Sequence, residues 1–116
     1  MKPVWQIRLT QSAEDDFQRI LRWTRTQFGL RQSKTYARTL SLALTDLVNG
    51  PHILGARQRE EIGSGIYTLH VARKGRRGRH FVVFRVSSSS AAPCIEVLRV
   101  LHETMDLPRH LPAAGN

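Results

Sequence analysis

Three short apolar runs in the second half of the chain constrain the fold more than any other feature. They occupy residues 66–71, 80–86 and 94–101. In the first run, Tyr67 and Leu69 alternate with Thr68 and His70, which is the period-two pattern of a β-strand. The links between the runs are short, and strands joined by short links pair antiparallel. The sequence therefore predicts an antiparallel sheet built from consecutive strands.

The first half predicts a strand followed by two helices. Residues 4–9 alternate apolar and polar side chains. Ser12 is a suitable N-cap for a helix that ends at Gly29, and a second helix is expected from Arg31 to Val48, before Gly50-Pro51. Each helix has an apolar stripe at helical spacing. Because the link at Gly29 is so short, the helices should be antiparallel neighbours.

These elements predict an α+β fold in a single domain covering residues 1–116. An N-terminal strand should lead into an antiparallel two-helix hairpin, which packs on one face of an antiparallel sheet of about four strands. Residues 60–62 are the candidate for a short edge segment, and a short C-terminal tail follows, with a turn of helix within residues 103–111. The other sheet face is left for solvent or a partner.

Five cations gather in the link between the first two apolar runs: Arg73, Lys74, Arg76, Arg77 and Arg79. Gly75 and Gly78 in the same link are expected to supply unusual backbone angles. The chain carries a net charge of +9, and residues 57–85 hold eight of its eighteen Lys and Arg residues. One interpretation is a soluble, highly charged surface. The sharper interpretation is a patch that binds nucleic acid or an acidic protein segment.

Three segments carry a resemblance to a known family: IRLTQSAEDDFQRILRWT, GIYTLHVARKGRRGRHFVVFRV and IEVLRVLHETMDLPRHL. In this order they resemble the ParE/RelE toxin superfamily of bacterial toxin–antitoxin modules, and ParE most closely. The resemblance implies a compact α+β toxin held inactive by a cognate antitoxin. ParE-like toxins poison DNA gyrase, whereas RelE-like toxins cut mRNA in the ribosomal A site. Operator DNA is bound only through the antitoxin.

A RelE-like enzyme would need a general acid or base and several cations around the scissile phosphate. The candidates are Arg85, Arg99 and His102. After His102 the tail has no tyrosine and no lysine, a departure that favours a ParE-like toxin without chemistry of its own. His102 has the alternative of bonding a backbone carbonyl and fixing the tail, and Arg85 has the alternative of pairing with Glu96.

The candidate binding residues are the five hairpin cations together with Tyr67 and Arg85. Tyr67 has the alternative of packing under the helices, and Trp5 and Trp23 are read as core or partner contacts rather than base-stacking platforms. A harmless basic binding module is the third function considered.

No cofactor and no metal are expected. His102, Asp106 and His110 are spaced by four, but Pro108 would interrupt a helix that aligns them. Cys94 is the single cysteine, no secretory leader is visible, and no apolar run approaches the roughly 20 residues of a membrane span. We therefore expect a cytoplasmic protein without membrane partners.

Overall fold

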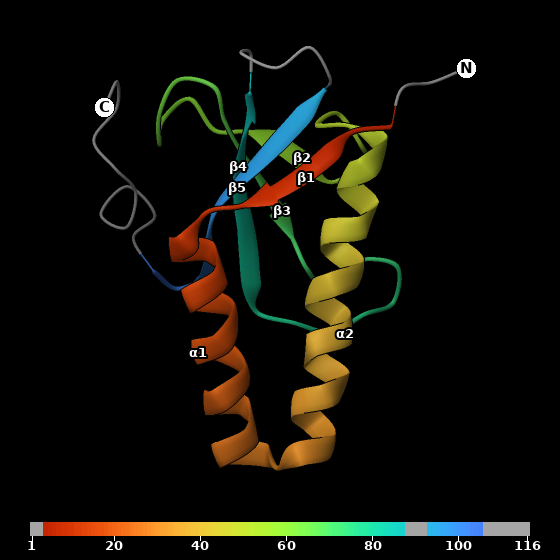
Figure 1. The fold of residues 1–116 in the computed structure, drawn as a ribbon, viewed down its shortest axis with the longest axis vertical. Coiled ribbons are helices and arrows are strands. Elements are labelled where there is room, and N and C mark those ends of the chain that lie inside the picture. The colour runs from red at the N-terminus through yellow and green to blue at the C-terminus, as the bar shows by residue number, and fades with distance from the viewer. Residues whose placement is uncertain (1–3, 88–92, 106–116) are drawn as a thin grey trace.

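The computed structural model describes residues 4–87 and 93–105 and shows two helices packed on one face of a five-stranded sheet (Figure 1). In chain order the elements are β1 (Gln6–Leu9), α1 (Gln11–Phe28), α2 (Leu30–Asp46), the 3-10 turn η1 (Leu47–Asn49), β2 (Ala56–Gln58), β3 (Ile66–His70), β4 (His80–Ser87) and β5 (Cys94–His102). The sheet order is β1-β5-β4-β3-β2. The predicted α+β fold with an N-terminal strand is confirmed.

The sheet differs from the prediction in two ways. It has five strands and is mixed, because β1 pairs parallel with β5, with Gln6 opposite Cys94 and Leu9 opposite Val97. The elements that come between β1 and β5 in the sequence form one long crossover connection, which a parallel pair of strands requires. The edge strand β2 lies at residues 56–58, whereas the expected edge segment at residues 60–62 forms a turn.

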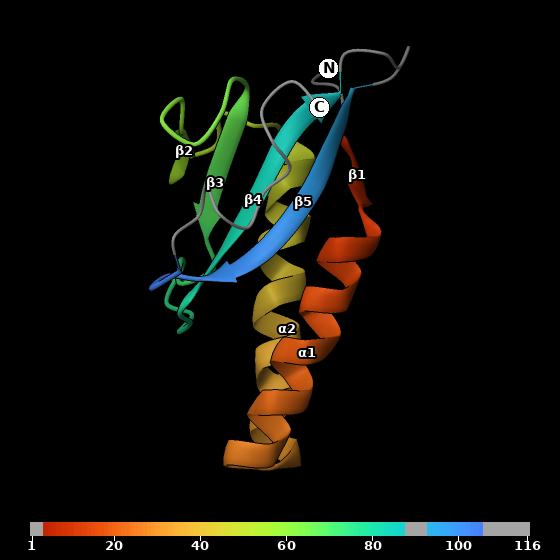
Figure 2. The same ribbon diagram turned by 90° about the vertical axis from the view of Figure 1, so that its left-hand side faces the viewer.

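The boundaries of the helical hairpin follow from its caps. Thr10, rather than Ser12, caps α1, because its Oγ1 accepts a hydrogen bond from the Ala13 N–H at 3.1 Å. Gly29, with φ of 94°, ends α1 and leads directly into α2. The hairpin extends beyond one end of the sheet (Figure 2). Its projecting end leaves Trp23, Phe28 and Leu30 at least half exposed.

The main core lies between the helices and the sheet. Leu40, Ala43 and Leu47 pack there against buried strand residues such as Phe84 and Ile95. A second, smaller cluster lies around Val83 and Leu101 and is packed by Ile62, Ile66 and Phe81. Part of the opposite face, expected to be free for solvent or a partner, is therefore buried. No helix in the described part of the chain is both long and apolar enough to cross a membrane.

A buried carboxylate joins α1 to β5. The chain leaves β1 after Leu9, and the β4–β5 pairing shifts register between Val83 and Phe84. Beyond Val97, β5 has no strand on the side where β1 pairs, while β4 continues along its other side to His102. Asp16 accepts the Val100 N–H there at 2.9 Å, and its oxygens lie 2.7 Å from Arg99 Nε and 2.9 Å from Arg99 Nη2. The side chain of Asp16 is only 1% exposed.

Burial by itself would raise the pKa of Asp16. The hydrogen bonds from Arg99 and Val100, together with the charges of Arg99 and Arg19, outweigh that effect and hold the pKa below its ordinary value. A carboxylate whose pKa is depressed by folding stabilises the fold above its unfolded pKa. That stabilisation is lost as the pH falls through the folded pKa.

We expect Asp16→Asn to lower the free energy of unfolding by about 3 kcal/mol, because it leaves Arg99 without its buried counter-charge. Urea unfolding at pH 7 measures the loss. Asp15→Asn is the matched control, since Asp15 is exposed and, within residues 4–87 and 93–105, accepts a hydrogen bond only from the Gln11 side chain. It should change stability by less than about 0.5 kcal/mol. Equal losses in the two variants would show that the Asp16 contact does not hold the fold.

Candidate functional site

Three of the five hairpin cations converge on one carboxylate. Asp46, the last residue of α2, lies 3.1 Å from Arg73 Nε, 3.2 Å from Lys74 Nζ and 2.8 Å from Arg76 Nη2. The side chains of Arg73 and Arg76 are only 15% and 17% exposed, and Arg73 Nη1 also donates to the Leu54 carbonyl at 2.8 Å. These cations therefore attach the β3–β4 hairpin to the end of α2.

Burial would raise the pKa of Asp46, but hydrogen bonds from Arg76 and Lys74 and the charges of Lys74 and Arg73 bring it below its ordinary value. The ionised carboxylate offsets the mutual repulsion of the three cations. A hairpin this basic is compatible with stability because an acid from another element lies among its charges.

Gly75 has the positive φ expected of it, at 79°, and Lys74 shares the left-handed region at 54°. Gly78 is needed for space instead. A Cβ there would lie 2.5 Å from Val71 Cγ2 and 2.9 Å from Tyr36 Oη. The absence of a side chain at Gly78 lets the hairpin approach α2 closely.

The remaining two hairpin cations face solvent. Arg77 is exposed and has no carboxylate partner among the described residues. Arg79 is 75% exposed at its side chain, and its Nη1 lies 3.4 Å from Glu103 Oε1. Lys74, at 60% exposure, is the third outward charge. The predicted patch is thus divided between inward, structural cations and outward ones that a partner could reach.

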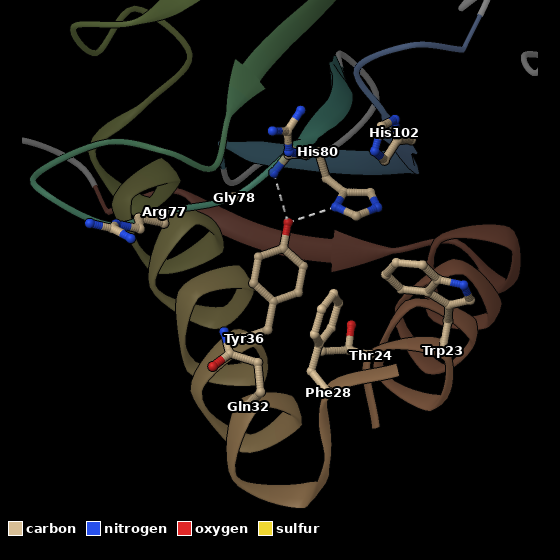
Figure 3. A pocket seen from close by; sticks show the side chains of 10 residues that line it. Trp23, Thr24, Phe28, Gln32, Tyr36, Arg77, Gly78, His80 and His102 are labelled. Atoms are coloured by element: carbon tan, nitrogen blue, oxygen red, sulfur yellow. Dashed lines mark hydrogen bonds between the residues drawn. The ribbon is translucent and has the colours of Figure 1, made fainter. Parts of the chain in front are cut away.

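Next to Arg79 lies a pocket of about 340 Å³ between the projecting end of the helical hairpin and the β3–β4 hairpin (Figure 3). Trp23 and Phe28 come from α1 and Tyr36 from α2. His80 and His102 face each other at the start of β4 and the end of β5, with ring centroids 5.2 Å apart. Aromatic and imidazole side chains therefore make up half of the lining residues.

Tyr36 connects the helices to the sheet at this pocket. Its hydroxyl accepts the Arg79 N–H at 3.1 Å and lies 2.6 Å from His80 Nδ1 (Figure 3). Burial raises the pKa of Tyr36, so the hydroxyl stays protonated and donates a hydrogen bond to His80 Nδ1. Burial, and secondarily the charge of His102, lower the pKa of His80 to about 4. His80 is therefore neutral near pH 7 and carries its proton on Nε2.

The open sheet face carries a row of charges across three strands. The carboxylate of Glu96 on β5 accepts hydrogen bonds from two arginines. Arg85 Nε of β4 donates to Oε1 at 2.8 Å, and Arg8 Nη2 of β1 donates to Oε2 at 3.0 Å. The expected Arg85–Glu96 pairing is confirmed. Both arginines are more than half exposed, at 52% and 68%, whereas Glu96 is 15% exposed. The row therefore presents more positive than negative charge to solvent.

The three residues considered for RNA cleavage lie in different settings. Arg85 is held by Glu96 on the open face, and Arg99 is held by Asp16 beneath α1. His102 lies at the pocket, where its Nδ1 accepts the Thr104 N–H at 3.2 Å. The structural alternative predicted a backbone carbonyl as the partner of His102, whereas the observed partner is this local N–H two residues along the chain.

The aromatic candidates divide between core and surface. Tyr67 stacks on Phe84 with centroids 5.5 Å apart and packs against the main core, and Trp5 also packs there. Trp23 is 56% exposed, so it is not a core residue. Asp106 and His110 lie outside the described residues, and within these no group of His, Cys, Asp and Glu side chains could hold a metal ion.

Sequence reasoning missed four residues that organise the site: Asp16, Tyr36, Asp46 and His80. Tyr36 followed the apolar stripe of α2, and His80 stood in an apolar strand. Their contacts join residues 44 apart in the chain, and those of Asp16 join residues 83 and 84 apart. For Asp16 and Asp46 the sequence offered one indication, because the chain has only nine acidic residues.

The fold is that of a small α+β toxin. The chain is similar to the chromosomal ParDE toxin–antitoxin system from P. aeruginosa, with a TM-score of 0.68 and 18% identity over 85% of this chain and 96% of that one. It is also similar to the YoeB/ParE toxin from Agrobacterium tumefaciens, with a TM-score of 0.55 and 19% identity over 84% and 96% of the two chains. At these identities the likeness is one of fold.

Sequence relatives identify the family. The model of the ParE toxin of type II toxin–antitoxin systems, parDE, matches residues 7–107. Toxin ParE1 of Caulobacter vibrioides is 30% identical over 111 residues, which are 96% of this chain and 99% of that protein. Toxin ParE1 of Mycobacterium tuberculosis is 31% identical over 103 residues, 89% and 94% of the two. The chain belongs to the ParE toxin family, as the resemblance predicted.

The lowered pKa of His80 predicts a specific dependence of stability on pH. Between its ordinary value of 6.5 and its folded value of about 4, the unfolded chain binds a proton that the folded chain does not. Stability should therefore fall as the pH drops through this window, by up to about 3 kcal/mol. We expect His80→Asn to flatten the profile in urea unfolding from pH 7 to 4. An unchanged slope would show that His80 is not its source.

Proposed function

We propose that this protein is a growth-arresting toxin that inhibits DNA gyrase in the cytoplasm and is neutralised by a cognate antitoxin. Membership in the ParE toxin family, over residues 7–107, is the observation that carries the proposal. The protein would meet operator DNA only through the antitoxin, and the proposal involves no membrane and no cofactor.

The distribution of charge supports a toxin that works by docking. With a net charge of +9, the chain attracts acidic surfaces over distances of about a Debye length. Lys74, Arg77 and Arg79 face solvent at one end of the sheet, and Arg8 and Arg85 lie on its open face. Two separate cationic surfaces could contact gyrase and its bound DNA without any bond being cut.

A ribosome-dependent endoribonuclease is the second candidate. It is favoured by the position of His102 at a pocket that also contains Tyr36, His80 and Arg79, since proton transfer and phosphate stabilisation need such groups together. Arg85 and Arg99, however, are each held by a carboxylate in another setting. Primer extension on translated mRNA would reveal cuts within codons if this candidate were right. A harmless binding module, the third candidate, would leave growth unaffected when expressed without an antitoxin.

We expect the purified protein to inhibit supercoiling by gyrase or to trap its double-strand cleavage product. The Arg77→Gln, Arg79→Gln double variant should need several-fold more protein for the same inhibition, because both side chains are exposed and cationic. Arg38→Gln, an exposed cation on α2, is a single-charge control that should act like the wild type. Complete supercoiling at a large excess of wild-type toxin would contradict gyrase as the target.

The antitoxin should depend on the outward hairpin cations. We expect Arg77→Glu with Arg79→Glu to weaken the toxin–antitoxin complex at least tenfold and to reduce the salt dependence of its Kd, since fewer charge pairs are formed. Arg73, Lys74 and Arg76 are left intact because they hold Asp46. Isothermal titration at two salt concentrations, with Arg38→Glu as control, measures the effect. Unchanged affinity and salt dependence would place the antitoxin elsewhere.

A further inference from the structure

The pocket beside Arg79 contains features that the fold does not require. Trp23 and Phe28 form an edge-to-face pair with centroids 5.8 Å apart, yet they are 56% and 64% exposed. Both lie in the second half of α1, close to the Gly29 link, and the helical hairpin extends beyond the sheet at that end (Figure 2). Large aromatic side chains that stay in water beside a concave surface are typical of a binding site.

The rings are arranged around a common hollow. Figure 3 shows Trp23 and Phe28 on one side of it, Tyr36 beside them, and His80 at the end nearest the sheet. A volume of about 340 Å³ is at the small end of ligand pockets, which is the scale of one nucleotide. A planar base inserted here would contact the indole and phenyl rings.

The polar groups at the sheet end of the pocket are mainly donors. Neutral His80 keeps an N–H on Nε2 while Tyr36 occupies Nδ1. His102 accepts the Thr104 N–H on Nδ1, which places its own proton on Nε2. Arg79 adds an exposed guanidinium that is only loosely paired with Glu103, at 3.4 Å. Such a set suits phosphate oxygens better than a peptide backbone, which presents donors as well as acceptors.

Further cations lie nearby. Arg19 precedes Trp23 by one helical turn on α1 and is 62% exposed at its side chain, although its Nη1 also lies 3.2 Å from Asp16 Oδ1. Arg77 borders the pocket and has no ion-pair partner in the described part of the chain. An anionic strand that passed the pocket would therefore find positive charge on both sides of it.

We propose that this pocket binds one unpaired nucleotide of single-stranded DNA, with the base against Trp23 and Phe28 and a phosphate near Arg79 and the two histidines. Exposed aromatic rings next to cations are the means by which proteins bind single strands without sequence preference. The choice of DNA rests on the proposed function, in which the target is an enzyme that handles DNA.

Fluorescence anisotropy of a fluorescein-labelled dT12 strand with the full chain tests the proposal. We expect Trp23→Leu to weaken binding about tenfold, which is within the range measured for one stacked base, and Trp23→Phe to retain most of the affinity. A 12-mer of abasic sites carries the same phosphates without bases and should bind weakly to both the wild type and Trp23→Leu. Arg38→Gln is the control for loss of one exposed cation. We expect Arg79→Gln to weaken binding of dT12 more than Arg38→Gln does.

Trp23→Leu should keep the wild-type urea midpoint, because the side chain is more than half exposed; Phe28→Leu is a second variant with the same expected loss. The proposal is overturned if both variants bind dT12 like the wild type, or if the abasic strand binds as tightly as dT12. Tighter binding of rU12 would assign the pocket to RNA. Loss of affinity in Trp23→Leu for an acidic tryptophan-containing peptide, but not for dT12, would assign it to a protein.

These measurements contain neither gyrase nor antitoxin. If binding of the dT12 strand does not depend on Trp23 but the protein still inhibits supercoiling, the inference about the pocket alone is wrong. If Trp23-dependent binding is found but gyrase is unaffected, the pocket remains and another target must be sought.

Discussion

The carboxylate of Asp16 is the buried polar contact that fixes α1 against β5. The strand β1 is short, so the edge of β5 beyond Val97 has no neighbouring strand, and its backbone N–H groups need other acceptors. Asp16 provides one for Val100 and at the same time neutralises Arg99. Because this anchor lies near the start of α1, the opposite end of the helix extends past the sheet (Figure 2). The exposed aromatic side of the pocket is a consequence of that geometry.

A second carboxylate, Asp46, fixes the other wall. It holds the β3–β4 hairpin against the end of α2, and the small size of Gly78 lets the hairpin reach Tyr36. The chain has nine acids against eighteen Lys and Arg residues, and three of the acids, Asp16, Asp46 and Glu96, together pair with seven different cations in the described contacts. The acids thus act as internal counter-charges, and the outward cations are the ones left to attract a partner.

The helices and four of the five strands could be predicted because each carries its own periodic pattern and its own end residues. The strand β2 could not, since Ala-Arg-Gln has no alternation and becomes a strand only by pairing with Leu69, Thr68 and Tyr67. The parallel pairing of β1 with β5 could not be predicted either, because it joins strands that are far apart in the sequence and no local pattern specifies it. In the site, sequence proximity suggested one cationic patch, but a distant acid decides which of its members face inward. The family resemblance was recognisable because it rests on local segments in order.

The pairing of the arginines also bears on how such a fold can act. To stabilise a phosphate, Arg99 would have to leave a carboxylate that is 1% exposed and that also holds the backbone of β5. Arg85 would have to leave Glu96, whose pKa lies below its ordinary value because the hydrogen bonds from Arg85 and Arg8 outweigh its burial. Breaking the buried Arg99–Asp16 pair costs several kcal/mol, so Arg99 is a poor candidate for a transient contact with a reacting phosphate, and Arg85 is held in a separate setting on the open sheet face. Arg77 and Arg79 face no comparable competition. Anion recognition by this toxin is therefore expected at the pocket end of the sheet, where cations and exposed aromatic rings occur together.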